Sequence, residues 1–506
     1  MASLDTRADS SSGLGDAALA PGKWILICIA LYLVRVLPWA MSELWHDEVI
    51  TLGDFVLGPD GRGPLHVFRS YPVANNHMLF SAFGWWWVRF IDFSSSEYML
   101  RLPCMAFGLV VIVLAVRSWR RWLGAELSCL AGVTLAISPV FGAFACEFRG
   151  YSLTMLLSAV AVQGLAEMSD GRLRRGLWLQ VPALFLLPLV IPSNVLLAFA
   201  HALFIALWPG WPGSRRARLA AALTLATAGA LGLSYYLTLW DQFIKVLHET
   251  TGWSSGLRVL GAVALGVWAH LGWAGIALPV AAFRRRPPDP DRSGQRTWAA
   301  LYAGCIAVPV LATMLGNYTN APFPRVYLLY LLPLTFAAFR FLRPSLLWSR
   351  RSFLLWAGLT VALGFAWEFA CARRTAAAVS RGEHPQNLLQ QYYRGRTDLR
   401  GVAAGVAEAG ALRGALVVTD AYDFPTFRFY WAQYGMSAEA VVAENRLPTE
   451  FWPRTRSLPS ASLHVVAGDE VAAARLFAAA AAPGAFVSGP VSKNRRFYSL
   501  LPPSAR

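Results

Sequence analysis

Two adjacent acidic residues, Asp47 and Glu48, follow the first long apolar segment of the chain. They end the stretch Trp45-His46-Asp47-Glu48, which comes directly after an apolar run over residues 24–41. Ionisable groups at a membrane boundary are rare and usually functional. A carboxylate in such a place can take the proton of an attacking hydroxyl group. Asp47 is therefore the candidate general base, and Glu48 either supports it or binds the acceptor.

Further polar side chains begin or end other apolar segments, at what we expect to be the same side of the membrane. They are Asn75, Asn76 and His77, then Glu147, Arg149 and Tyr151, then Asn317, Tyr318 and Arg325. Carboxylate, imidazole and guanidinium groups from distant parts of the chain are thus expected at one depth. Such a set predicts one polar site that opens outward beside the lipid.

This combination of groups suits the transfer of a sugar from a lipid phosphate. The leaving phosphate gains negative charge, which arginine stabilises through its planar fork of donors. We expect Arg149 and Arg325 to hold the phosphate, with His77 and Tyr151 lining the donor pocket. The donor's hydrocarbon tail would lie between the membrane spans.

Simpler interpretations of these residues stay open at the level of sequence. Asp47 and Glu48 could cap a loop helix, and Glu147 could pair with Arg149 for structural reasons only. Arg325 could be an interfacial anchor. The agreement among several residues favours the functional interpretation more than any one of them does.

The composition predicts an α-helical polytopic membrane protein. Of the 506 residues, 56% are hydrophobic and 15% are charged, against about a quarter charged in soluble proteins. Mean hydropathy is +0.44. The net charge of +16 comes largely from arginine clusters between apolar runs, as cytoplasmic loops require, so nucleic-acid binding is not expected. The six cysteines lie in or beside apolar segments without a CxxC pair, which argues against a disulfide framework or a zinc site.

The arginine clusters also predict the topology. With residues 1–22 as a disordered cytoplasmic tail, about eleven spans place most clusters inside. This arrangement of spans requires the tryptophan-rich residues 78–93 to lie along the membrane surface, within a first outer loop over residues 42–98. A second outer loop is expected over residues 241–249.

Three regions are predicted: the tail over residues 1–22, a transmembrane catalytic domain over residues 23–372, and a polar domain over residues 373–506. The last contains strand-like runs at residues 416–418 and 464–466, each followed by an acidic turn and an alanine-rich helical pattern. Strands that alternate with helices indicate a small α/β domain. An odd number of spans places it outside the cytoplasm.

Four motifs, in order and spacing, resemble the GT-C superfamily of integral-membrane glycosyltransferases. They are Trp45-His46-Asp47-Glu48, Asn75-Asn76-His77-Met78-Leu79-Phe80, Arg101-Leu102-Pro103 and Glu147-Phe148-Arg149-Gly150-Tyr151-Ser152-Leu153. The nearest likeness is to bacterial relatives of protein O-mannosyltransferases and to aminoarabinose transferases. The resemblance covers about residues 24–345, and the C-terminal domain matches no family.

The resemblance implies a GT-C fold with juxtamembrane helices in the first outer loop, and Asp47 as the base. It implies a polyprenyl-phosphate sugar donor, inversion at the anomeric carbon, and a cell-envelope glycan, lipid or protein as acceptor. Residues Arg325 and Tyr327 resemble an element that contacts the donor phosphate. No cofactor is certain, but some relatives bind a divalent metal ion, for which Glu48 and His77 would be the ligands. The family's prolines near His77 are absent.

The resemblance also implies a multi-pass protein of the bacterial cytoplasmic membrane. A transporter or flippase of lipid-linked sugars is the first alternative, although the sequence lacks the internal repeat that many transporters show. A non-catalytic scaffold and a ligase that uses lipid-diphosphate donors are the others.

Overall fold

A computed structural model describes most of the helical part of the chain and the core of the C-terminal unit. The described residues are 20–58, 63–71, 76–91, 96–250, parts of 261–277, 290–315, 328–343, 350–380, 399–408, 416–419, 423–436, 440–443, 463–467, 470–479, 486–492 and 495–500.

The described regular secondary structure in the first half of the chain is all helical. Its α-helices are α1 (Pro21–Ala40), α2 (His46–Ile50), α3 (Met78–Trp87), α4 (Glu97–Val113), α5 (Arg120–Leu123), α6 (Ala125–Ile137), α7 (Pro139–Ala145), α8 (Tyr151–Ser169), α9 (Leu173–Val190), α10 (Val195–Leu207), α11 (Arg215–Ser234) and α12 (Trp240–Thr250). Later come α15 (Pro290–Leu315), α16 (Leu331–Leu342) and α17 (Arg350–Ser380). Shorter helical segments include η2 (Thr51–Leu57), η3 (Pro64–Arg69) and η4 (Leu114–Ser118).

Six helices in the described part are long and apolar enough to cross a membrane, and the bent pair α6–α7 would be a seventh. The six are Pro21–Ala40, Glu97–Ser118, Tyr151–Ser169, Leu173–Val190, Arg215–Val246 and Arg351–Ala377. The predicted α-helical polytopic membrane fold is confirmed. The total of about eleven spans stays a prediction, since residues 257–283 lie largely outside the described part.

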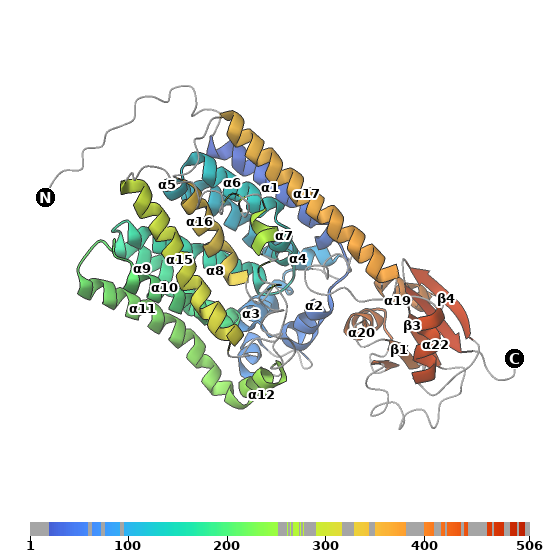
Figure 1. Ribbon diagram of the computed structural model, residues 1–506. Helices are drawn as coiled ribbons and strands as arrows, with labels where there is room; N and C mark the ends of the chain where they lie inside the picture. Colours follow the sequence, from blue (N-terminus) through green and yellow to red (C-terminus); the bar gives the residue numbers. More distant parts are fainter. Residues whose placement is uncertain are drawn as a thin grey trace.

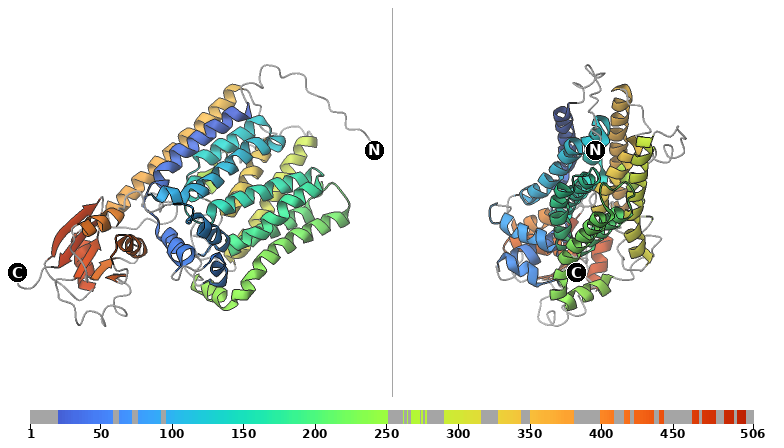
Figure 2. Two further views of the ribbon diagram at one scale, coloured as in Figure 1. Left: turned by 180° about the vertical axis from the view of Figure 1, so that it is seen from behind. Right: turned by 90° about the vertical axis from the view of Figure 1, so that its left-hand side faces the viewer.

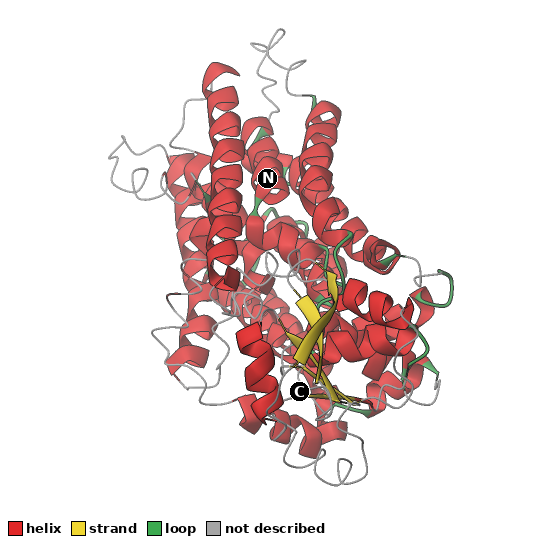
Figure 3. Ribbon diagram, turned by 90° about the vertical axis from the view of Figure 1, so that its right-hand side faces the viewer, coloured by secondary structure: helices red, strands yellow, loops and turns green. Residues whose placement is uncertain are grey.

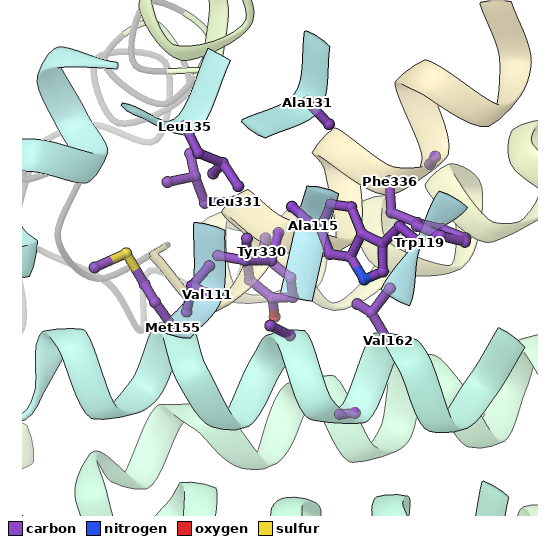
Figure 4. Close-up of a cluster of buried hydrophobic side chains, with 14 of the residues drawn as sticks. Val111, Ala115, Trp119, Ala131, Leu135, Met155, Val162, Tyr330, Leu331 and Phe336 are labelled. Atoms are coloured by element: carbon purple, nitrogen blue, oxygen red, sulfur yellow. The ribbon is translucent and has the colours of Figure 1, made fainter. Parts of the chain in front are cut away.

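Most of the membrane helices share one large apolar core. Figure 4 shows its centre, where Trp119 at the end of η4 meets Phe336 of α16 edge to face, with ring centroids 5.2 Å apart. Met155 and Val162 of α8 lie against the same cluster. Large buried side chains of this kind stabilise the bundle, and they hold α8 at a fixed place relative to α4.

The long helix α17 runs beside α1 along the edge of the bundle and leads to the C-terminal unit (Figures 1 and 2). Trp24 packs edge to face on Phe353, with ring centroids 4.7 Å apart. Arg35, buried in α1, forms an ion pair with Glu368 of α17 at 2.7 Å. Two contacts near opposite ends of α1 therefore hold α17 against the bundle.

In three segments, the structure adds detail to the predicted elements. The surface helix α3 has 10 residues, about 15 Å, which is too short for a membrane core about 30 Å thick. The chain is bent by 63° between α6 and α7, within an apolar segment long enough to be one span; Ser138 caps α7 and Pro139 begins it. The segment predicted as an outer loop, residues 241–249, forms helix α12 (Trp240–Thr250), and its position outside the membrane stays a prediction.

The C-terminal unit contains a five-stranded sheet in the order β2-β1-β3-β5-β4. The strands are β1 (Leu416–Thr419), β2 (Val441–Ala443), β3 (Leu463–Ala467), β4 (Phe486–Ser492) and β5 (Arg495–Leu500), with helices α19 (Leu399–Glu408), α20 (Phe424–Gln433) and α22 (Glu470–Ala479). Strand β1 pairs in parallel with β2 and β3, whereas β5 pairs antiparallel with β3 and β4. Strands thus occur at both strand-like runs, and all of them gather in this one unit (Figure 3).

Candidate active site

The acidic pair lies on the short helix α2, directly after the first membrane helix. Glu48 accepts a hydrogen bond from the backbone N–H of Trp45 at 2.8 Å, which satisfies a free donor at the helix start. Asp47 is only 4% exposed and Glu48 is fully buried. Neither carboxylate is therefore an ordinary surface cap, and each needs a positively charged or N–H partner.

The partners come from a short non-helical segment, residues 146–150, between α7 and α8. Here the backbone turns tightly, and the N–H of Arg149 donates to the carbonyl of Glu147 at 2.6 Å. This turn directs the Arg149 side chain toward α2 and the backbone N–H of Phe148 toward Glu48. Both Glu147 and Arg149 are buried.

Arg149 is the centre of the candidate site. One of its terminal nitrogens donates to Asp47 Oδ2 and to the Tyr151 hydroxyl, each at 2.7 Å. Its other terminal nitrogen lies 3.3 Å from His77 Nε2. The sequence predicted that these four residues lie near one another, and the structure brings them into direct contact.

His77 is held in a defined orientation by Gly150. The backbone N–H of Gly150 donates to His77 Nδ1 at 2.9 Å, so a neutral ring carries its proton on Nε2, the nitrogen that faces Arg149. A Cβ atom on Gly150 would lie 3.0 Å from His77 Nδ1 and 2.5 Å from Val190 Cγ1. Glycine is therefore required at position 150 for this close approach.

Asp47 and Glu48 have separate partners although they are neighbours in sequence. Glu48 Oε1 accepts from Arg101 Nε at 2.9 Å and from the Phe148 N–H at 2.6 Å, and Oε2 accepts from Arg101 at 2.5 Å. Arg101 also donates to the backbone carbonyl of Ala40, at the end of α1, and to that of Ser42, which follows it. Glu48 and Arg101 thus connect α1, α2, α4 and the segment before α8.

Arg101 received no role in the prediction, although a signal for it is present. It is an arginine within an apolar helix, and such a residue almost always pairs with another buried polar group.

Tyr71 was also missed. Burial raises the pKa of the Tyr71 phenol while the charge of Arg149 partly opposes this rise, so Tyr71 is a neutral neighbour of the site.

The remaining predicted residues fall into two groups. Asn76 is buried, and its side-chain amide donates to the carbonyls of Val67 at 3.1 Å and Ser70 at 2.7 Å, which shapes the first outer loop. Asn75, Asn317, Tyr318, Arg325 and Tyr327 lie outside the described residues. Their proximity to Arg149 stays a prediction.

The proposed metal ligands do not fit a divalent ion in this arrangement. Glu48 already accepts four hydrogen bonds, two of them from the positively charged Arg101. A metal ion would have to displace these donors and approach a buried guanidinium group. Within the described residues, no group of three histidine, cysteine or acidic side chains has the geometry to hold a metal ion.

Asp47 Oδ1, the oxygen that does not contact Arg149, lies near His46. The distance between His46 Nε2 and Asp47 Oδ1 is 3.5 Å, and the His46 side chain is 31% exposed. Asp47 therefore uses Oδ2 for Arg149 and directs Oδ1 toward the more accessible side of the cluster. This geometry suits proton transfer at Oδ1 while Oδ2 is held in place.

Comparison with known proteins shows a relationship in structure only. No family model and no curated protein matches the sequence. The crystal structure of ArnT from Cupriavidus metallidurans in the apo state aligns with a TM-score of 0.57 at 15% identity, over 96% of this chain and 98% of that one. The same protein bound to undecaprenyl phosphate aligns with a TM-score of 0.55 at 15% identity, over 95% and 98%. The chain therefore has the GT-C fold of ArnT.

Proposed function

We propose that this protein is a membrane-embedded glycosyltransferase that moves a sugar from a polyprenyl-phosphate donor to an extracytoplasmic acceptor. The observation that carries the proposal is the buried cluster in which Arg149 contacts Asp47, Tyr151 and His77. The cluster occurs in a chain with the fold of ArnT, a protein that has been crystallised with undecaprenyl phosphate. A phosphate-linked lipid donor is consistent with both.

In the proposed reaction, the acceptor hydroxyl attacks the anomeric carbon from the face opposite the phosphate. A bond forms between the acceptor oxygen and that carbon, and the bond from carbon to phosphate oxygen breaks. The electron pair leaves with the polyprenyl phosphate, and Asp47 takes the acceptor proton. One displacement of this kind inverts the configuration of the sugar.

The donor phosphate would bind beside Arg149 and His77. The Nε2 proton of a neutral His77 and a terminal N–H group of Arg149 come from nitrogens 3.3 Å apart. Two neighbouring donors suit an oxygen whose negative charge grows during the reaction. Tyr151, Asn76 and Glu147 complete the proposed pocket, and the predicted donors Arg325 and Tyr327 would act on the same phosphate.

Glu48 is proposed to position Asp47. Its two oxygens accept four hydrogen bonds from within the protein, so it supports the loop better than it could bind an acceptor. Removing one member of a fully bonded buried pair leaves the other charge without its partner. This assigns different tasks to two adjacent carboxylates.

The proposed setting is the bacterial cytoplasmic membrane, with the site and the C-terminal unit on the outer side. The acceptor would be a cell-envelope glycan, lipid or protein. Support comes from the apolar helices and from the positions of the arginine clusters along the sequence.

The function can be tested with purified protein in liposomes that contain one polyprenyl-phosphate sugar at a time, with a cell-envelope extract added as the source of acceptor. We expect donor-dependent release of polyprenyl phosphate for the wild type, and release at least about 100-fold slower for Asp47→Asn. In a deletion strain, mass spectrometry should detect the accumulated lipid-linked sugar, which identifies the donor. Transport of intact donor across the bilayer without cleavage would instead favour a flippase, and cleavage at a diphosphate would favour a ligase.

A further inference from the structure

The C-terminal unit contacts the loop that carries the acidic pair. Helix α20 lies beside α2 (Figure 1), and one apolar cluster includes residues of both. Leu44, Val49 and Leu52 from the loop belong to this cluster together with Phe427 and Trp431 from α20. The two regions are thus packed against each other through buried side chains.

Tyr430 of α20 forms a directed hydrogen-bond bridge at this contact. Its hydroxyl accepts from the backbone N–H of Leu44 at 2.8 Å and donates to Glu97 Oε1 at 2.9 Å. Burial, and after it the charges of Glu97 and Glu43, raises the pKa of Tyr430 well above its usual value. The hydroxyl therefore keeps its proton and can donate to Glu97 across the physiological pH range.

A second set of contacts joins the same regions. Arg400 of α19 donates to both oxygens of Glu97, at 2.8 and 2.9 Å. The Glu43 carboxylate accepts from the backbone N–H of Leu399, at the start of α19, at 2.8 Å. A carboxylate is favoured at a helix N-terminus by the unpaired N–H groups there.

The membrane helices hold this stretch from the other side. Arg101 donates to the carbonyls of Ser42 at 2.5 Å and Glu43 at 3.0 Å, while Glu48 accepts from the N–H of Trp45. Each of the four residues from Ser42 to Trp45 is therefore fixed by a backbone hydrogen bond. The bond at Leu44 comes from the C-terminal unit, and the others come from the membrane helices or from α2 itself.

We propose that Tyr430 is a positioning residue for catalysis, through which the C-terminal unit holds the loop that carries Asp47. The inference deepens the proposed function and rests on it. Tyr430 fixes the N–H of Leu44, three residues before Asp47, and the Arg400–Glu97 pair fixes the acceptor of the Tyr430 hydroxyl. Catalytic groups must be held to within a fraction of an ångström, and a displacement of about 1 Å can reduce turnover by about 100-fold.

The test uses the full-length protein with the substitution Tyr430→Phe, which removes only the hydroxyl. The matched control is Tyr98→Phe, which makes the same change at the residue after Glu97. Tyr98 packs against the apolar core of the membrane helices. A second test variant, Glu97→Gln, alters the bridge from its other end without changing α20.

Two measurements are made on each variant. Amide hydrogen exchange is recorded without substrate over residues 42–48, and steady-state transfer is recorded with varied donor. We expect Tyr430→Phe to raise exchange at Leu44 by at least about 10-fold and to lower kcat by about 10-fold, with the donor KM changed less than about 2-fold. Tyr98→Phe should match the wild type in both measurements.

The outcomes separate this proposal from the proposed function. The positioning role is overturned if amide hydrogen exchange at Leu44 is unchanged in both Tyr430→Phe and Glu97→Gln. It is also overturned if this exchange rises while kcat stays unchanged. A higher donor KM with unchanged kcat overturns it as well, because that result indicates a role in binding. If the wild type transfers no sugar, the proposed function fails, whereas the exchange measurement still reports whether Tyr430 holds the loop.

Discussion

One nitrogen of Arg149 lies 2.7 Å from Asp47 Oδ2 and equally close to the Tyr151 hydroxyl. In this arrangement the two side chains form a buried ion pair, which holds the Asp47 carboxylate in place. A donor phosphate that binds Arg149 would compete for the same N–H groups. We therefore expect donor binding to weaken the contact between Arg149 and Asp47.

The first prediction concerns Asp47. The substitution Asp47→Asn keeps the size of the side chain but removes its ability to take a proton. We expect kcat to fall by about 100-fold to 10,000-fold, the usual contribution of general-base catalysis. The amide oxygen of asparagine can still accept from Arg149, so the loss of unfolding free energy should be smaller than in Glu48→Ala. Transfer at the wild-type rate would show that another group is the base.

The second prediction concerns the planar guanidinium of Arg149. Arg149→Lys keeps the charge but cannot contact Asp47, Tyr151 and His77 at once. We expect kcat/KM for the donor to fall by about 10-fold to 100-fold, since lysine does not reproduce the fork of donors. Arg89→Lys is the matched control, because Arg89 is exposed in the turn that follows α3, in the same outer loop. Equal effects of the two substitutions would argue against a specific role of Arg149.

The third prediction separates Glu48 from Asp47 by stability. Glu48→Ala leaves Arg101 fully buried without its acidic partner, which should cost about 3–5 kcal/mol of unfolding free energy. The measurement is chemical unfolding in detergent, with Asp47→Asn compared under the same conditions. If Glu48→Ala unfolds like the wild type, the Glu48–Arg101 pair does not have the proposed supporting role.

The fourth prediction concerns the close packing at Gly150. Gly150→Ala would place a methyl group in contact with His77 and Val190, so the ring must move away from Arg149. We expect a loss of donor affinity and of kcat together, with Gly53→Ala of η2 as the control, since a Cβ at Gly53 meets nothing within 4 Å. Unchanged donor binding in Gly150→Ala would remove His77 from the phosphate site.

Much of the site could be predicted from the sequence because its members are polar residues beside apolar segments. Asp47, His77 and Arg149 were assigned to one site for that reason, and their contacts agree with it. The different partners of Asp47 and Glu48 could not be predicted. Successive side chains on a helix point about 100° apart, so the start of α2 decides which carboxylate meets Arg149 and which meets Arg101.

The contact between the C-terminal unit and the active-site loop was also beyond sequence reasoning. Leu44 and Tyr430 are 386 positions apart, and no periodic pattern encodes a contact over such a distance. The strands β1 and β3 were predictable, in contrast, because short runs of β-branched residues indicate buried strands. Local patterns thus predict elements, while the packing of two units depends on their surfaces.

The last prediction concerns the pH dependence of the C-terminal unit. His464 of β3 hydrogen-bonds Ser499 of β5 at 2.8 Å, and burial lowers the pKa of this imidazole from 6.5 to about 4. The folded unit therefore holds His464 neutral at a pH where the unfolded chain would bind a proton. Its contribution to stability is complete above pH 6.5 and is lost as the pH falls toward 4.

We expect this loss to amount to roughly 1–2 kcal/mol, because partial solvent screening reduces the full effect of the shift. The measurement is unfolding of the full-length protein between pH 4 and pH 8, for the wild type and for His464→Gln. Glutamine cannot take up a proton, so the substitution should flatten the part of the pH profile that lies between the two pKa values. An equally steep profile in both proteins would show that the acid sensitivity arises from groups other than His464.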